Sequence, residues 1–151
     1  MSSRLVRAGL LTGISDGLFS TVLVTFFYGS TPARLWQGVA STVGASTVWV
    51  GLLMHFGVAF GWSAVFLFVV LRAGWVRSLL ASPHGTIKVA ALYGPFVWLV
   101  MSLVVIPILV HHAPAINFRW WVQLIGHFPF VGLPIVASIN YQSLPRGPAA
   151  S

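Results

Sequence analysis

Three ionisable side chains, Asp16, His55 and His127, stand inside long apolar runs of this sequence. Asp16 is the sole acidic residue of the chain. At about 1.5 Å per helical residue it falls roughly 12 Å inside its apolar run. An ionised carboxylate there is costly unless it is paired, protonated or hydrated. Asp16 is therefore either a proton or cation site, or a neutral acid hydrogen-bonded to Ser15, Ser20 or a polar group on another helix.

His55 and His127 lie at similar distances from the ends of their own runs, in the half of the membrane away from Asp16. Two imidazoles at one depth suit a haem iron or a chlorophyll magnesium. The alternative is that each histidine hydrogen-bonds across helices. Two histidines are too few for zinc without further ligands, and the chain has no cysteine. We predict no metal and no cofactor, with a haem or chlorophyll-type pigment at these two residues as the alternative.

The sequence carries none of the patterns of an enzyme active site. It has no serine-elbow motif, no phosphate-binding loop and no dinucleotide fingerprint. Its eight lysines and arginines are scattered singly, without the basic patch and exposed aromatics of a nucleic-acid binder. We therefore expect a protein that is neither an enzyme nor a partner of nucleic acid.

The composition indicates that these residues are positioned by helices in a lipid bilayer. Of 151 residues, 58% are hydrophobic and 6% are charged, whereas a soluble domain carries about 25% charged residues. Spanning helices need about 20 apolar residues each. We predict one all-α transmembrane domain over 1–151, an integral membrane four-helix bundle with helices at about 8–28, 49–71, 88–110 and 120–141.

The segments between these helices are less strongly patterned. The milder stretch 33–48 is predicted to be an interfacial helix or the start of an extended second helix. The stretches 73–86 and 111–119 contain turn-forming residues and are predicted to be loops. Pro107, Pro129 and Pro134 fall inside the last two spans, where a kink is tolerated.

The basic residues predict the orientation of the bundle. Cytoplasmic segments of membrane proteins carry an excess of lysine and arginine. With both termini inside, two basic residues, Arg34 and Arg119, lie outside. The others lie inside: Arg4, Arg7, Arg72, Arg77, Lys88 and Arg146. We therefore predict that both termini are cytoplasmic.

Glycines spaced by four suggest how the helices pack. Gly9, Gly13 and Gly17 share one face of the first predicted helix, and Gly57 and Gly61 repeat the spacing on the second. Small residues at this spacing let a partner helix approach closely. The spacing does not indicate whether that partner belongs to this chain or to another.

Several short stretches carry a resemblance: 13–19 on the first helix, 32–40 after it, 53–56 on the second, 92–94 on the third, and 126–127 and 131–135 on the fourth. They resemble small bacterial inner-membrane proteins of unassigned function, related to the YagU-like family. The resemblance implies a four-helix protein of the bacterial inner (cytoplasmic) membrane and little about activity. The polar positions that match are Asp16, Arg34, Gln37, His55 and His127. One departure is that Ala45 follows Gly44, where such proteins often carry arginine.

Two functions fit these features. Small size, little mass outside the membrane and glycine-faced helices favour an accessory subunit of a larger respiratory or photosynthetic membrane complex, with lipid and other subunits as partners. The alternative is a small self-contained carrier or channel that uses Asp16. Four helices leave little room for alternating access, so a carrier of this size would work as a homodimer.

Overall fold

The computed structural model describes residues 2–140, and among these residues every regular element is helical. Four helices are long and apolar enough to cross a membrane: Ser3–Phe27, Val48–Arg72, Gly85–Val110 and Phe118–Asn140. The predicted all-α, four-span architecture is confirmed. Large apolar side chains such as Leu18, Leu53 and Ile125 are mostly exposed on the outside of the spans, as expected of a multi-pass membrane protein surrounded by lipid.

Each span has its own internal make-up. The first comprises α1 (Ser2–Val22) and a π-helical turn, Leu23–Phe27. The second comprises α3 (Val48–Phe68) and a 3-10 turn, Val70–Arg72. The third comprises α5 (Gly85–Val100), a π-helical turn, Met101–Val105, and α6 (Ile106–Val110). The fourth comprises α7 (Phe118–His127), a π-helical turn, Phe128–Gly132, and α8 (Leu133–Asn140).

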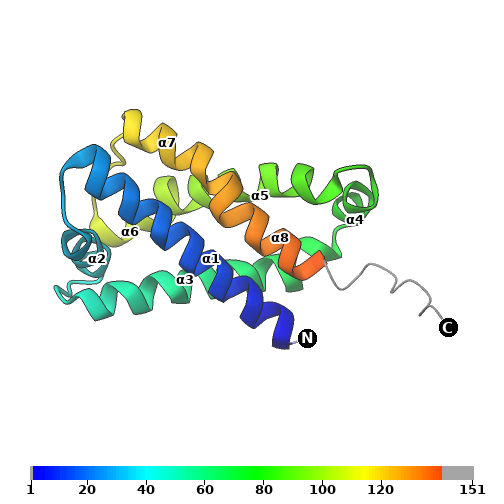
Figure 1. Cartoon of the computed structure of the whole chain (residues 1–151), viewed down its shortest axis with the longest axis horizontal. Coiled ribbons are helices and arrows are strands. Elements are labelled where there is room, and N and C mark those ends of the chain that lie inside the picture. Colours follow the sequence, from blue (N-terminus) through cyan, green and yellow to red (C-terminus); the bar gives the residue numbers. More distant parts are fainter. Residues whose placement is uncertain (1, 141–151) are drawn as a thin grey trace.

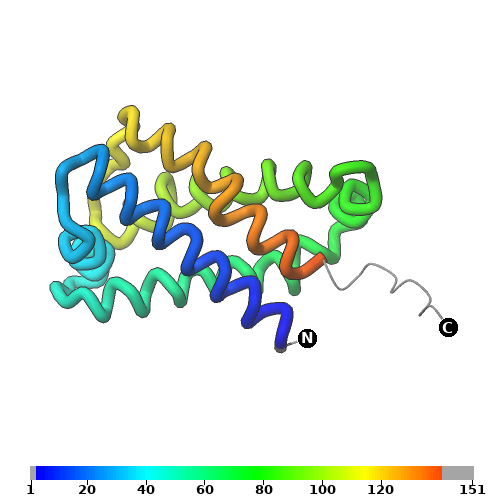
Figure 2. Tube along the Cα trace, viewed as in Figure 1, coloured from blue at the N-terminus to red at the C-terminus, as the bar shows by residue number. Residues whose placement is uncertain are grey.

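Successive spans run in opposite directions. In Figure 1, α1 and the α7–α8 span lie obliquely across α3 and α5, and the tube in Figure 2 traces the same up-and-down path. The first residues of α1, the last residues of α8 and α4 lie at one end, which we call the terminal end. The short helix α2 (Pro32–Ser41) lies at the other, which we call the α2 end.

The two segments between the early spans are both helical. The stretch 33–48 contains the separate helix α2, which begins where Thr31 Oγ1 accepts a hydrogen bond from the Arg34 backbone N–H at 3.3 Å. Gly44, at φ +76°, lies in the turn before α3, so α2 is not the start of the second span. The prediction of a loop over 73–86 was wrong, because α4 (Gly74–Ala81) lies there and buries Val76 completely.

Three of the four prolines in the later spans coincide with π-helical turns, and the fourth, Pro95, lies inside α5. A proline has no N–H and its ring displaces the carbonyl four residues earlier. Pro107 follows the turn in the third span, and Pro129 and Pro134 lie within and just after the turn in the fourth. Pro134 leaves the Phe130 carbonyl without its α-helical donor, and Ser15 Oγ of α1 lies 2.6 Å from that carbonyl and donates to it.

The terminal half of the bundle is solid. Tyr93 of α5 is buried there and donates from its hydroxyl to the Trp62 carbonyl at 2.7 Å. The buried cluster consists of Ala8, Phe66, Val76, Val89, Ala90, Tyr93, Val97, Val131, Ile135, Val136 and Ile139. These side chains come from α1, α3, α4 and the last two spans, so one core joins all four spans at this end.

The two predicted glycine faces differ in whether another helix of the chain packs against them. The first-span glycines lie against α3: a Cβ at Gly9 would strike the Phe60 ring, and one at Gly13 the Phe56 ring. A Cβ at Gly17 would lie 3.3 Å from His55 Nε2. Gly57 and Gly61, in contrast, have no described atom within 4 Å of a Cβ built on them. Their role as a docking face for another chain stays a prediction.

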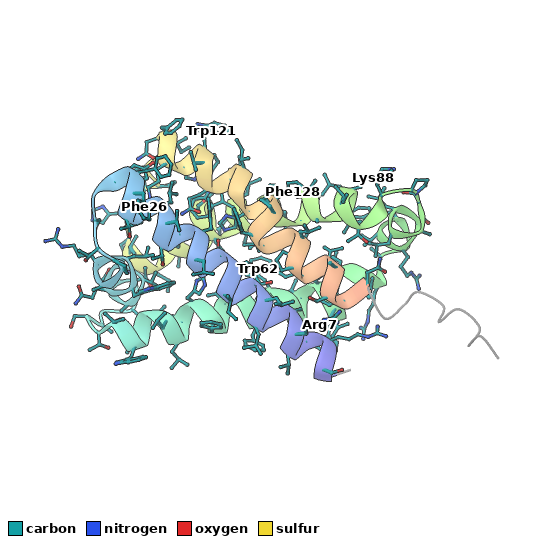
Figure 3. All side chains as sticks on the ribbon, viewed as in Figure 1. Arg7, Phe26, Trp62, Lys88, Trp121 and Phe128 are labelled. Carbon is teal, nitrogen blue, oxygen red and sulfur yellow. The ribbon has the colours of Figure 1, made fainter. Side chains whose placement is uncertain are left out.

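Basic residues concentrate at the terminal end. Five of the six predicted cytoplasmic residues belong to helix ends or to α4 at this end, and Figure 3 shows Arg7 and Lys88 there, opposite Phe26 and Trp121. Arg146 lies outside the described residues. Arg34 and Arg119 belong to α2 and to the start of α7 at the α2 end. Which end faces the cytoplasm stays a prediction.

Candidate functional site

A cavity of about 330 Å³ occupies the half of the bundle nearer α2. All four spans and α2 contribute to its wall, which is mostly apolar. Its polar residues are Thr12, Asp16, Ser20, Thr42, His55, Arg119, Gln123 and His127. The three ionisable residues predicted from the sequence therefore line one cavity.

Asp16 and His55 form the central contact of this cavity. His55 Nδ1 lies 4.0 Å from Asp16 Oδ2, and the two side chains are 14% and 15% exposed. The expectation that Asp16 and the histidines occupy opposite halves of the membrane was wrong. The first span begins at Ser3 rather than Ala8, which puts Asp16 near its middle, and α1 crosses α3 obliquely.

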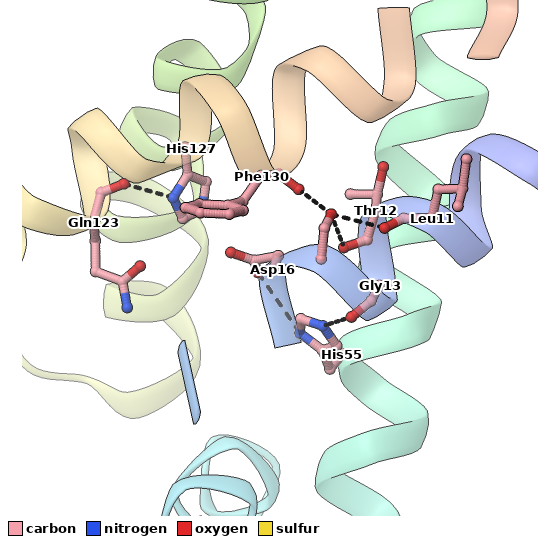
Figure 4. Close-up of polar contacts among 9 residues, drawn as sticks. Leu11, Thr12, Gly13, Asp16, His55, Gln123, His127 and Phe130 are labelled. Carbon is pink, nitrogen blue, oxygen red and sulfur yellow. Dashed lines mark hydrogen bonds and ion pairs between the residues drawn. The ribbon is translucent and has the colours of Figure 1, made fainter. Parts of the chain in front are cut away.

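The partner of Asp16 is thus His55 rather than a neighbouring serine. Ser15 Oγ lies close to backbone carbonyl oxygens, 2.7 Å from that of Leu11 and 2.6 Å from that of Phe130. A hydroxyl that donates to these carbonyls has no hydrogen left for a carboxylate. Figure 4 shows Asp16 between His55 on one side and the α7 residues Gln123 and His127 on the other.

The hydrogen bonds of His55 determine where its proton lies. His55 Nε2 is 2.9 Å from the Gly13 carbonyl oxygen, which can only accept, so Nε2 carries a hydrogen. Nδ1, which faces Asp16, carries a second hydrogen only in the imidazolium form. The geometry therefore leaves two places for a further proton, Nδ1 of the imidazole and the carboxyl group of Asp16. Trp36 and Phe56 pack edge-on against the imidazole ring, at 5.1 and 5.7 Å between centroids.

A hydrogen bond to a backbone carbonyl also fixes the orientation of His127. Its Nδ1 donates to the Gln123 carbonyl oxygen at 2.7 Å, so Nε2 is an acceptor when the ring is neutral. The ring packs on Trp98, 4.8 Å away between centroids, and the residue is only 7% exposed. This geometry holds the imidazole in one tautomer beside the cavity.

Four buried polar atoms of the cavity wall have no hydrogen-bond partner within the described residues. They are Thr12 Oγ1, Asp16 Oδ1, Trp98 Nε1 and Gln123 Oε1. Buried polar atoms are nearly always hydrogen-bonded, because leaving one unsatisfied costs about 1–3 kcal/mol. Three of the four are oxygens that accept hydrogen bonds. The wall is therefore suited to a polar guest that donates them.

The haem or pigment site at His55 and His127 stays a prediction that this geometry supports less well. Axial ligation requires a free ring nitrogen. In His55, Nε2 is committed to the Gly13 carbonyl and Nδ1 faces Asp16. Within residues 2–140, no group of three or more histidine, cysteine or acidic side chains is placed to hold a metal ion.

The polar positions predicted on α2 lie away from the cavity. Arg34 and Gln37 are exposed and line none of it, while Leu35 and Val39 of the same helix do. Three residues of the cavity wall were not predicted from the sequence: Thr12, Trp98 and Gln123. Thr12 lies one helical turn before Asp16, and a search for polar side chains on that face of the helix finds it.

Comparisons of the chain with protein-family models, with curated proteins and with solved structures found no match. The resemblance to the YagU-like family accordingly stays a prediction.

Proposed function

We propose that this chain is a small membrane carrier in which the Asp16–His55 pair binds the coupling proton. The observation that supports it best is the position of the pair, which lines a cavity shared by all four spans. A bundle with only a structural role gains nothing from such a cavity, because close-packed apolar side chains stabilise a bundle better than unsatisfied polar atoms do.

The pair is suited to exchange a proton. A carboxylate inside an apolar bundle is stabilised by a neighbouring cation, and His55 is the histidine that the structure places beside it. Loss of the neighbouring cationic group favours protonation of the Asp16 carboxylate, and binding of another cation beside the carboxylate favours its ionised form again. Ionisable side chains inside membrane proteins commonly mark such proton or ion pathways.

The test is proton flux in liposomes that contain the purified full-length chain and a trapped pH-sensitive dye. With an imposed pH gradient, the natural sequence should collapse the gradient faster than empty liposomes do. Asp16→Asn should abolish the difference, whereas Arg34→Gln, on the exposed side of α2, should retain it. Equal rates for liposomes with the natural sequence and for empty liposomes, with protons alone and with inorganic or small organic cations on the opposite side of the membrane, would contradict the proposal.

A second candidate, a non-catalytic accessory subunit of a larger respiratory or photosynthetic complex, is favoured by a different observation. Gly57 and Gly61 leave a strip of α3 with no described atom near it, although α3 belongs to a packed bundle. A helix of another subunit fits against such a strip. Native mass spectrometry after extraction in mild detergent should then detect larger subunits bound to the chain. Recovery of a monomer or homodimer alone would exclude this function.

The membrane and orientation belong to the same proposal. We place the chain in the bacterial inner membrane, as the resemblance to the YagU-like family implies, and both termini in the cytoplasm, because the basic residues gather at the terminal end. Under this orientation the cavity half of the bundle faces away from the cytoplasm. Reporter fusions at residue 1 and within 111–117 should report cytoplasmic and external locations, respectively, and the reverse would contradict the orientation.

A further inference from the structure

We infer that the cavity binds a small organic cation, an ammonium group on a compact apolar body, in exchange for the proton that Asp16 and His55 share. This inference rests on the proposed carrier function and names its cargo. It depends on four features of the cavity: its charge, its hydrogen-bonding atoms, its apolar wall and the hydrogen bond of His55 Nε2, which leaves Nδ1 facing Asp16.

The charge of the cavity favours a cation. Asp16 is the sole acidic residue of the chain, and it contributes to the wall with one carboxylate oxygen unpartnered. Among residues 2–140, the one permanently charged basic side chain of the wall is Arg119, whose guanidinium carbon lies 5.2 Å from the centroid of the Tyr28 ring. Tyr28 is about 18 Å from Asp16 along the first span, at 1.5 Å per residue. Arg119 is therefore held at the α2 end, away from the carboxylate.

The hydrogen-bonding atoms fit an ammonium group. Asp16 Oδ1, Gln123 Oε1 and Thr12 Oγ1 are buried acceptors without a donor among the described residues. His127 Nε2 adds a fourth acceptor, because Nδ1 already donates to a carbonyl. An ammonium nitrogen donates up to three hydrogen bonds and accepts none. An anionic guest, which only accepts, could take hydrogen bonds from Trp98 Nε1 and the Thr12 hydroxyl but would leave Asp16 Oδ1 and Gln123 Oε1 unsatisfied.

The rest of the wall fits an apolar body. Trp62 and Trp98 contribute to it, and indole faces attract a cation as well as an apolar surface. Aliphatic side chains of α3 and of the third span, such as Met54 and Val105, complete it. A largely apolar cavity of about 330 Å³ with a few convergent polar atoms is at the small end of the range for ligand pockets. It accommodates a compact amine and excludes a large lipid.

Exchange follows from the arrangement of the charged and titratable groups. Those lining the cavity are Asp16 on α1, His55 on α3, and His127 and Arg119 on α7, and none comes from α2 or the third span. A bound ammonium beside Asp16 disfavours an adjacent imidazolium, because two cations would then crowd one carboxylate. His55 then gives its Nδ1 proton to water while Nε2 still donates to Gly13. One cation enters and one proton leaves, so the net charge of the cavity is unchanged.

The experiment is calorimetric titration of the purified full-length chain in detergent with three matched probes. Phenethylamine is a cation, phenethyl alcohol is its neutral counterpart, and phenylacetate is an anion of similar size. We expect the amine to bind at least about tenfold more tightly than either of the others. Titration in buffers of different ionisation enthalpy should show that amine binding releases protons. The number released should approach one per amine at a pH where every Asp16–His55 pair carries the shared proton.

Variants assign the binding to Asp16. Asp16→Asn should weaken amine binding at least about tenfold, and Asp16→Glu should keep the preference for the amine. Arg34→Gln should bind the amine as the natural sequence does. Unchanged helical circular dichroism identifies the variants that fold.

The other outcomes overturn the inference. Binding of the alcohol or of phenylacetate as tightly as the amine would overturn the cationic cargo and leave the carrier function intact. Absence of binding by all three probes would also overturn it, while proton flux in liposomes decides the carrier function independently. Amine binding without proton release would overturn the exchange.

Discussion

Asp16 and His55 lie side by side inside an apolar bundle, so we expect that the effects of their substitutions are not additive. His55→Ala leaves the carboxylate without its neighbour at 4.0 Å, whereas in an Asp16→Asn background the imidazole has no charge to balance. We expect a coupling energy of about 1–3 kcal/mol in a double-mutant cycle. The free energy of unfolding of the four proteins, measured by denaturing-detergent titration, gives this value. Additive single effects would mean that the two side chains do not interact.

The site residues could be found from the sequence singly but not as a cluster. Asp16, His55 and His127 stand out because ionisable side chains are rare in apolar runs. Their association depends on the tilt of α1 and on the residue where the first span begins, and the hydrophobic pattern of the sequence predicts neither. Gln123 and Thr12 are uncharged and give no such signal, although together they contribute two of the four unpartnered atoms.

Within the helices, Ser15 compensates for a proline of another span. Pro134 deprives the Phe130 carbonyl of a backbone donor, and Ser15 Oγ lies 2.6 Å from that oxygen. Ser15→Ala should lower the free energy of unfolding by about 1–2 kcal/mol, because it leaves a carbonyl unsatisfied within the bundle. In a Pro134→Ala background the N–H of residue 134 is restored, and the same substitution should cost less. An equal cost in both backgrounds would show that the serine acts in another way.

Contact between the third and fourth spans depends on backbone approach at glycine. A Cβ at Gly94 would overlap the His127 carbonyl oxygen and lie 3.0 Å from the Gly132 nitrogen. Gly94→Ala should therefore destabilise the bundle by about 1–3 kcal/mol. The matched control is Gly57→Ala, where no described atom lies within 4 Å of the new carbon. Its better helix propensity should leave stability unchanged or raise it by up to about 1 kcal/mol. Similar melting temperatures for both variants would contradict this packing.

The four spans were predictable because twenty-residue apolar runs have few alternatives to a membrane-crossing helix. The short helix α4 was not, because its sequence, 74–81, is followed at once by the turn formers Ser82 and Pro83. Val76 is fully buried there, so tertiary packing onto the core stabilises a helix too short to be stable alone.

Across the whole molecule, the two halves of the bundle are built differently. The terminal half is closed by the buried cluster around Phe66 and Tyr93, while the α2 half contains the cavity and its unpartnered polar atoms. Two of the three π-helical turns of the spans contribute side chains to the cavity wall, among them Met101 and Val131. Such turns widen a helix locally and are common at functional sites. The cavity thus approaches the α2 end and is separated from the terminal end by close packing.

This asymmetry predicts which positions of the bundle a polar reagent reaches. The natural sequence has no cysteine, so single cysteines can be introduced without removing others. Ser20→Cys, on the cavity wall, should react with a charged methanethiosulfonate several-fold faster than Ala90→Cys, in the solid half, where the native residue is fully buried. The variant Arg34→Cys, whose cysteine replaces an exposed residue, gives the reference rate for an accessible position.

The charge of the reagent adds a second comparison. Residue 20 lies one helical turn from the carboxylate of Asp16, so the ratio of the cationic to the anionic reaction rate should be higher there than at residue 34. Phenethylamine should slow the reaction at residue 20 and leave the rates at residues 34 and 90 unchanged. Equal rates at residues 20 and 90 would show that the cavity is closed to water at both ends. The site would then have to open before a proton or a cation could reach Asp16.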